Sequence, residues 1–380
     1  MRYSVLVSVY QQLEATTKRL EKTNILATFL KTVPPADLPV VIPLVRGKIF
    51  PDYDERNLGV ADKLAAKAIH QATGATTEKL SSVWKETGDI GAAAARLITS
   101  KKQATLTSHP LTVEKIFTNL KKLATLEGHG SVDQKIGLIA ELLTSATPAE
   151  AQYIIRTVLE DLRVGLGDGT MRDAITWAYF GDTLNVVYDP QKNDIGLSDE
   201  KRATYGDVIT TVQEAYDVAI DWSIVAATAA ASGLDGLRKI ELEPGRPVKV
   251  MLYQKARGIA DAFETIGKPA ILEYKYDGFR MQVHKKGQTI RIFTRNLEDV
   301  TTQFPDVVAV IKTAVHADRY IIDGEAIGYD LTTKKFVSFQ EISQRIKRKH
   351  NIAQMTRELP VVLVIFDILF LEGKTLLKTP

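Results

Sequence analysis

The spacing of apolar residues changes once along this chain of 380 residues, and that change limits the fold more than any other feature. Before position 236, apolar residues recur every three or four positions, as in the stretch 6–13, which is typical of amphipathic helices. After position 267 they alternate with polar residues, as in the stretch 279–283, which is typical of strands. Glycine and proline gather in between, at 232–247. We therefore expect an all-α domain at 1–236, a linker at 237–246 and an α+β domain built on antiparallel sheets at 247–380.

The composition excludes several classes of site and location. The chain has no cysteine, so disulfides, cysteine-ligated zinc and thiol catalysis are excluded. No apolar run is long enough to span a bilayer, and the first residues mix charged with apolar side chains, unlike a signal peptide. The formal net charge of +3 does not by itself indicate a nucleic-acid partner. We expect a cytoplasmic, monomeric protein with no membrane contact, in which oxygen or histidine holds any metal.

The stretch 271–283 is the one that looks suited to chemistry. Lys275 ends a short apolar run and an Asp-Gly turn follows, which predicts an amine held where a strand stops. A lysine amine attacks only when apolar neighbours or positive charge lower its pKa, and the run before Lys275 together with Arg280 could supply both. Asp277 would orient the amine, and Gly278 would let the backbone approach a phosphate or ribose. The alternative is an ordinary hairpin with a solvated lysine.

Two further segments of the second domain carry candidate site residues. Asp323-Gly324-Glu325 places two carboxylates within an apolar strand. Buried acids need a partner or a cation, so Glu325 is a candidate for Mg²⁺ or for a ligand hydroxyl, and an exposed Glu325 after a turn is the alternative. The run 361–367 is continuously apolar and predicts a strand buried on both faces, in which Phe366 would ordinarily belong to the core.

Two glycine-rich turns of the helical domain indicate contacts with phosphates. Each opens a helix, where backbone N–H groups and small residues allow a phosphate to come close. An ordinary helix C-cap is the alternative for any single glycine. Helix starts are also predicted at a capping box from Thr147 to Glu150 and at the N-cap residues Asp89 and Ser131. The candidate phosphate contacts are Gly128, Gly130 and Ser131 in the first turn, and Arg163, Gly165 and Gly167 in the second.

The order and spacing of four short motifs resembles that of the ATP-dependent DNA ligases, and the archaeal type most closely. The helical region, with its segments FPDYDERNLGV and VGLGDGTMRDAI, resembles the DNA-binding domain that precedes catalysis in that family. The resemblance implies an all-α DNA-binding domain followed by an α+β nucleotidyltransferase (adenylation) domain, incomplete in this chain. The motifs are Lys275-Tyr276-Asp277-Gly278, Thr294-Arg295-Asn296, Asp323-Gly324-Glu325 and Phe366-Asp367-Ile368-Leu369.

A three-step reaction is implied by this resemblance. Lys275 would attack the α-phosphate of ATP to form lysyl-AMP, AMP would pass to the 5′-phosphate of a nick in double-stranded DNA, and the 3′-hydroxyl would displace it. Positioning and charge neutralisation are the main needs of phosphoryl transfer, which suits arginines and Mg²⁺. The implied roles are adenine recognition for Glu273, contacts with ribose and phosphate for Arg280 and Arg295, ribose or metal binding for Glu325, and stacking on adenine for Phe366.

The sequence also departs from the family's pattern. No later Glu-Gly motif, lysine pair or OB-fold segment follows Pro380, so we expect a truncated ligase that binds DNA but seals nicks poorly. Some archaeal relatives bind the sliding clamp through a glutamine-led motif; Gln103 is present here without the aromatic pair, so clamp binding is a hypothesis. RNA ligases and capping enzymes share the lysine motif but usually lack such a helical domain. A non-catalytic helical DNA-binding protein with a degenerate nucleotide pocket is the alternative of another class.

Overall fold

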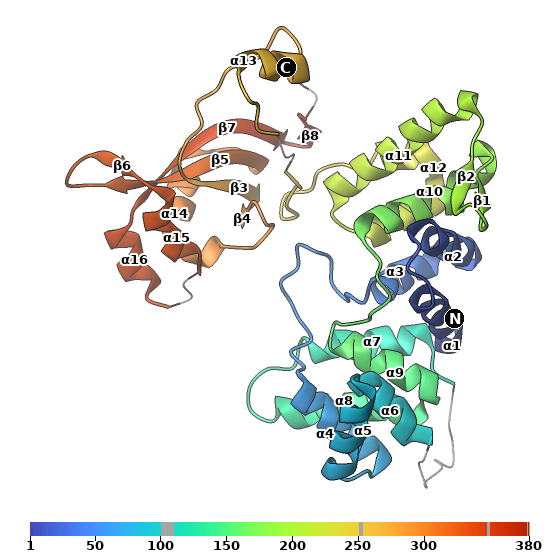
Figure 1. Ribbon diagram of the computed structural model, residues 1–380. Helices are drawn as coiled ribbons and strands as arrows, with labels where there is room; N and C mark the ends of the chain where they lie inside the picture. Colours follow the sequence, from blue (N-terminus) through green and yellow to red (C-terminus); the bar gives the residue numbers. More distant parts are fainter. Residues whose placement is uncertain (100–109, 251–253, 348–349, 378, 380) are drawn as a thin grey trace. The chain divides into compact units, whose positions relative to one another are not determined.

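The computed structural model describes residues 1–99, 110–250, 254–347, 350–377 and 379 (Figure 1). The chain divides into two units. The first comprises Met1–Tyr216 with Asp221–Ile240, and the second comprises Asp217–Ile220 with Glu241–Pro380. The later boundary falls inside the stretch 237–246 that we expect to be a linker. The segment at Gln103, proposed to bind a sliding clamp, lies outside the described residues.

The first unit is helical, which confirms the fold class expected for this part of the chain. The residues at helical spacing are the buried ones, and Leu6, Tyr10 and Leu13 are completely buried. One hairpin, β1 with β2, interrupts the helices, and its strands are too short to show alternation in the sequence (Figure 1). The elements are α1 (Tyr3–Glu14), α2 (Arg19–Thr32), η1 (Pro35–Asp37), α3 (Leu38–Arg46), α4 (Asp62–Thr73), α5 (Thr77–Thr87), α6 (Ile90–Thr99), α7 (Val113–Leu123), α8 (Ser131–Ser145), α9 (Pro148–Val158), α10 (Asp168–Leu184), β1 (Val187–Asp189), β2 (Asp194–Gly196), α11 (Asp199–Ala219) and α12 (Trp222–Arg238).

Three helix starts test the predicted caps. The Thr147 hydroxyl accepts from the backbone N–H of Glu150 at 3.3 Å, and the Glu150 carboxylate accepts from the backbone N–H of Thr147 at 2.8 Å, so the capping box is confirmed. Asp89 accepts from a backbone N–H in the first turn of α6 at 2.9 Å, as predicted. The prediction for Ser131 is wrong, because Ser131 is the first residue of α8 and Gly130, with φ of +81°, holds the N-cap position. The left-handed turn there favours glycine over serine.

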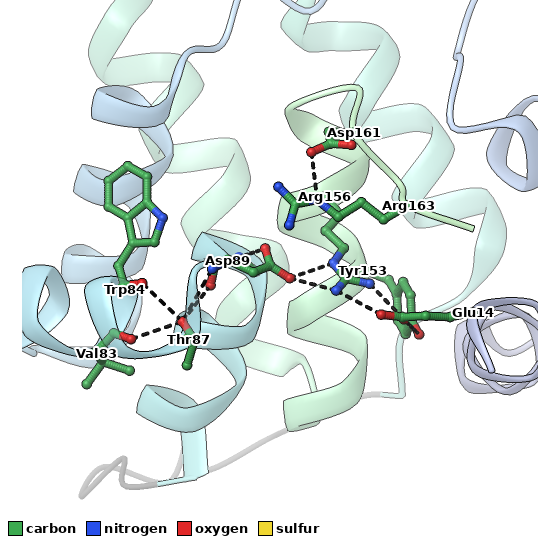
Figure 2. Close-up of polar contacts among 10 residues, drawn as sticks. Glu14, Val83, Trp84, Thr87, Asp89, Tyr153, Arg156, Asp161 and Arg163 are labelled. Carbon is green, nitrogen blue, oxygen red and sulfur yellow. Dashed lines mark hydrogen bonds and ion pairs between the residues drawn. The ribbon is translucent and has the colours of Figure 1, made fainter. Parts of the chain in front are cut away.

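A buried charged network joins three helices of the first unit (Figure 2). Arg156 of α9 is only 6% exposed and donates from Nε to Asp89 at 2.8 Å. Its terminal nitrogens donate to the Glu14 carboxylate of α1 at 2.8 and 3.1 Å, and the Tyr153 hydroxyl donates to the same carboxylate at 2.6 Å. Because every charge in the group has a partner, burial of the guanidinium is tolerated. The network borders a cavity of about 450 Å³ that Trp84 also lines.

Replacement of Arg156 by methionine should destabilise the first unit by about 3–5 kcal/mol, because Asp89 and Glu14 would lose their shared cation. Denaturant unfolding followed by circular dichroism measures the loss. Arg96→Met is the matched control: its ion pair with Glu86, at 2.8 Å, has side chains 56% and 61% exposed, so its loss should cost less than about 1 kcal/mol. Equal losses from the two substitutions would contradict the importance of the buried pairing.

The second unit is built on a six-stranded antiparallel sheet, which confirms the expected α+β class. The strand order is β4-β3-β5-β7-β8, and β6 pairs with β5 (Figure 1). The elements are α13 (Ile259–Ile266), β3 (Phe279–Lys286), β4 (Thr289–Thr294), η2 (Thr301–Gln303), α14 (Pro305–Ala314), β5 (Arg319–Asp330), β6 (Lys335–Val337), α15 (Phe339–Lys347), α16 (Ile352–Glu358), β7 (Val361–Leu371) and β8 (Lys374–Thr375).

The main apolar core of the second unit lies on one face of this sheet. Met281 and Val283 of β3 and Ile322 of β5 pack in one cluster with Ile311 of α14 and Ile342 of α15. Successive side chains of a strand point to opposite faces. The residues between these core positions therefore point to the other face, which carries most of the candidate site.

The prediction that residues 361–367 are buried on both faces is wrong. In β7, Val361 and Leu363 pack against the core, whereas Ile365 and Phe366 are 45% and 43% exposed. The register of β7 against β5 shifts twice, and such irregularities break the alternation of a strand. Phe366 is therefore accessible rather than part of the core.

No single helix in the described ranges is both long and apolar enough to cross a bilayer. Within the same ranges, one pair of helices, α2 with Pro35–Arg46, reaches both limits of length and composition, but it is bent by 115°.

Candidate active site

The register of β3 and β5 gathers candidate residues on one face of the sheet. Arg280 lies opposite Glu325, and Gln282 lies opposite Asp323. Residues directly opposite each other in an antiparallel pair point to the same face, so all four side chains lie on the face away from the main core. Arg295 follows the last residue of β4, whose pair with β3 ends near Arg280.

Arg280 is held by Asp323, for which the sequence alone indicated no role. The Arg280 Nε lies 3.0 Å from each oxygen of the Asp323 carboxylate, and a terminal nitrogen makes a further ion pair with it. Asp323 is completely buried. Burial raises the pKa of the Asp323 carboxyl, and the guanidinium of Arg280 opposes that rise. The signal in the sequence was the first carboxylate of the Asp-Gly-Glu motif, which needed a cationic partner within an apolar strand.

Glu325 and Phe366 border the same guanidinium. The Arg280 guanidinium carbon lies 5.7 Å from the centre of the Phe366 ring. Burial raises the pKa of Glu325, whereas the positive charges of Lys275 and Arg280 act to lower it. Arg280, Glu325 and Phe366 therefore form one electrostatic and aromatic neighbourhood, and the charge of the exposed Lys275 acts on its carboxylate.

The segment before β3 differs from its prediction. Residues 271–276 are not in a strand, and Lys275 precedes a strand instead of ending one. The side chains of Ile271, Leu272 and Tyr274 are 88%, 91% and 88% exposed, so the expected apolar shielding of Lys275 is wrong. Periodicity suggested a strand, but the ladder with β5 begins only at position 279, and an apolar run without a ladder partner stays irregular.

Two of the predicted nucleotide contacts have exposed side chains. Glu273 and Arg295 are exposed, and none of the contacts in the described part of the chain links them to Arg280 or Glu325. Asp277 is exposed as well, at the turn into β3. Their predicted roles remain predictions.

The glycine of the lysine motif is required by the sheet itself. A Cβ atom on Gly278 would overlap the backbone carbonyl of Ala326 on β5. Gly324 has the same constraint, since a Cβ there would lie 2.6 Å from the carbonyl oxygen of Val364 on β7. Both glycines let neighbouring strands approach at the point where Arg280 and Glu325 project.

Gly278→Ala should therefore destabilise the second unit by about 1–3 kcal/mol, because the added methyl group forces β3 away from β5. Gly258→Ala is the matched control, since its φ of −177° suits any residue and no atom lies within 4 Å of an added Cβ. Thermal unfolding of both variants measures the difference. A Gly278→Ala protein as stable as the control would show that the strands can separate freely.

The two glycine turns of the first unit adopt left-handed conformations. Gly128 and Gly130 have φ of +82° and +81°, with no atom within 4 Å of an added Cβ, and Gly165 has φ of +62°. The Lys22 ammonium donates to the Val164 carbonyl at 2.6 Å and so fixes the second turn. The two turns thus immediately precede α8 and α10. The space beside Gly128 and Gly130 is free of protein atoms and could admit a ligand.

Arg163 lies beside the second turn and is partly free to meet a ligand. It donates to Asp161 at 2.7 Å, and both side chains are about half exposed. An exposed ion pair of this kind exchanges partners at little cost.

Comparisons with known proteins give a consistent result. The family model described as "DNA ligase N terminus" matches residues 2–176, and the "ATP dependent DNA ligase domain" model matches residues 250–380. A DNA ligase of Nanoarchaeum equitans is 39% identical over 380 residues, which cover 100% of this chain and 62% of the relative. A DNA ligase of Methanothermobacter thermautotrophicus is 41% identical over 371 residues, which cover 98% of this chain and 61% of the relative.

Among solved structures, the ligase domain from M. tuberculosis LigD is 29% identical over 28% of this chain and 31% of that chain, with a TM-score of 0.22. That likeness is slight. The chain spans 62% of the length of the Nanoarchaeum equitans ligase and 61% of the length of the Methanothermobacter thermautotrophicus ligase.

Proposed function

Because this chain belongs to the ATP-dependent DNA ligase family, we propose that it carries the adenylating lysine and the duplex-binding unit of an enzyme that seals nicks in double-stranded DNA. The observation that best supports the proposal is the neighbourhood of Arg280, Glu325 and Phe366, in which the charge of Lys275 acts on Glu325. A fixed cation, a carboxylate, an aromatic ring and an amine are the parts that nucleotidyl transfer needs.

In the first step the Lys275 amine attacks the α-phosphorus of ATP. A phosphorus–nitrogen bond forms, the bond to the leaving pyrophosphate breaks, and the amine loses a proton. The 5′-phosphate of the nick then attacks the phosphorus of AMP, which breaks the phosphorus–nitrogen bond and frees Lys275. The 3′-hydroxyl finally attacks the 5′-phosphorus, loses its proton and displaces AMP to form the phosphodiester. Each step is a displacement at phosphorus, so rate depends on alignment and on charge neutralisation.

The residues around Lys275 would divide the work of binding. Arg280, fixed by its buried partner Asp323, would contact the ribose or the α-phosphate. Phe366 would stack on adenine with its exposed ring. The proposed contacts of Glu273 with adenine and of Arg295 with phosphate require these exposed side chains to turn toward the nucleotide.

The donor set at Glu325 suits Mg²⁺ bound mainly by the nucleotide. The described residues hold no group of three acidic or histidine side chains that could form a metal cage. Mg²⁺ usually needs only one or two carboxylates beside substrate phosphates and water, and Asp323 is already occupied by Arg280. Glu325 would therefore be the protein ligand, and the ion would neutralise charge on the phosphates.

Incubation with ATP labelled at the α-phosphate tests the adenylation step. The chain should gain one acid-labile AMP, and Lys275→Ala should lose it entirely because the nucleophile is gone. Lys268→Ala is the control, since this lysine lies seven residues before Lys275, its ammonium contacts the Phe263 ring at 5.0 Å, and the variant should keep the label. Retention of the label in Lys275→Ala, or its absence from the wild-type chain and a full-length relative treated alike, would reject the proposal in favour of a non-catalytic DNA-binding protein.

The first unit would bind duplex DNA through phosphates, with little dependence on sequence. The proposed contacts are the turn of Gly128, Gly130 and Ser131, where a Cβ added to either glycine would meet no atom within 4 Å, and the turn containing Arg163, Gly165 and Gly167. Helix N-termini favour anions through their free N–H groups and the helix dipole. Contacts of this kind position a duplex without reading bases. A duplex-binding unit also favours DNA joining over the RNA ligase or capping alternative.

Arg163→Gln should weaken binding to nicked and intact duplexes alike, because one phosphate contact is lost. The slope of log affinity against log salt concentration should fall by about 1, measured by fluorescence anisotropy. Asp161→Asn removes only the ion-pair partner of Arg163 and should not weaken binding. An unchanged salt slope in Arg163→Gln would place the phosphate contact elsewhere.

A further inference from the structure

A segment that begins in the expected linker is fastened along the face of the sheet that carries Arg280. We call residues 243–248 the strap. Alternate residues of β3 hold it, and these residues share the face of Arg280 because strand side chains repeat with a period of two. The strap thus runs beside the candidate nucleotide site as part of the second unit.

Gln282 makes the strongest attachment. Its Oε1 accepts from the Val248 backbone N–H at 2.8 Å, and its Nε2 donates to the Val248 carbonyl at 2.7 Å. The side chain is 2% exposed. The amide therefore satisfies both polar groups of one strap residue, as a neighbouring strand would do.

His284 and Lys286 continue the attachment. The His284 Nδ1 accepts from the Gly245 backbone N–H at 3.1 Å, and the Lys286 ammonium donates to Glu243 at 3.0 Å. Burial lowers the pKa of His284 to about 3, so the ring stays neutral and keeps its acceptor at neutral pH. Residues 282, 284 and 286 of β3 thus bind residues 248, 245 and 243 of the strap, so the strap and β3 run in opposite directions.

The strap ends next to the ion pair of the candidate site. Gln282 lies two residues from Arg280 on β3 and directly opposite Asp323 on β5. Val248 packs in a small apolar cluster with Ile321, which lies two residues from Asp323 on the same face. An apolar cover at this place limits the access of water to a carboxylate that is completely buried.

We propose that Gln282 is a positioning residue: by fixing Val248 and with it the strap, it keeps the Asp323 carboxylate dry and its partner Arg280 aimed at the nucleotide. This inference rests on the proposed function of the second unit. Gln282 itself would not touch the nucleotide. Gln282 would affect the affinity for ATP only through Asp323 and Arg280.

The test compares Gln282→Met, which keeps the size of the side chain but loses both hydrogen bonds, with Gln354→Met on the exposed helix α16. Hydrogen exchange of the Val248 amide and of the Arg280 Nε–H, followed by NMR, reports on the strap and on the ion pair without any nucleotide. Both should exchange about tenfold faster in Gln282→Met and be unchanged in Gln354→Met. Gln282→Glu keeps the acceptor for the Val248 N–H, so its exchange rates should lie between those of Gln282→Met and those of the wild-type protein.

ATP affinity is measured in a Lys275→Ala background, where no covalent step intervenes. Gln282→Met should raise the dissociation constant about tenfold, and this effect should disappear when Asp323→Asn is also present, because both changes act through Arg280. Additive effects, or faster exchange at Val248 with no change at the Arg280 Nε–H, would overturn the positioning role. If neither the wild-type chain nor a full-length relative forms an AMP adduct, the proposed function fails, and exchange at Arg280 still decides whether the strap holds the ion pair.

Discussion

The candidate nucleotide face depends on the pairing of Arg280 with Asp323. A carboxylate that is completely buried in a sheet is costly unless a cation and hydrogen bonds compensate for its lost water. Arg280 supplies both through two Nε contacts of 3.0 Å and a further ion pair. The same pairing removes the freedom of a long side chain, so the guanidinium is already directed toward Glu325 and Phe366 before a ligand arrives.

The short motifs of this chain serve packing and chemistry together. Gly278 and Gly324 each follow an aspartate, and each lies where a neighbouring strand leaves no room for a Cβ. The close approach of β3, β5 and β7 that these glycines permit is what brings Arg280, Asp323 and Glu325 to adjacent positions. The sequence predicted a strand at Asp323-Gly324, with a turn as the alternative, and Gly324 does lie inside a strand of twelve residues.

The sequence predicted the features that depend on local spacing and missed those that depend on distant neighbours. Helical periodicity located the helices of the first unit, and the capping box at Thr147 uses only residues within one turn. The segment 271–275 was predicted to be the end of a strand because it is largely apolar, yet a strand requires a ladder partner that the sequence pattern cannot reveal. Phe366 was ambiguous for the same reason, since its exposure follows from register shifts between β7 and β5. Asp323 was visible in the sequence as an acid close to Glu325, but its partner Arg280 became evident only from the register of β3 against β5.

The period of two along β3 divides the functions of this strand. Met281 and Val283 enter the core, while the intervening positions carry a guanidinium at 280, an amide at 282 and an imidazole at 284. Only the first of these polar groups lies at the candidate site, because the strap covers the next two. A shift of one residue in register would bury the guanidinium in the apolar core and expose the core residues, so the sheet would lose its stability and its site together. The hydrophobic pattern that folds β3 therefore also determines which of its side chains can meet a nucleotide.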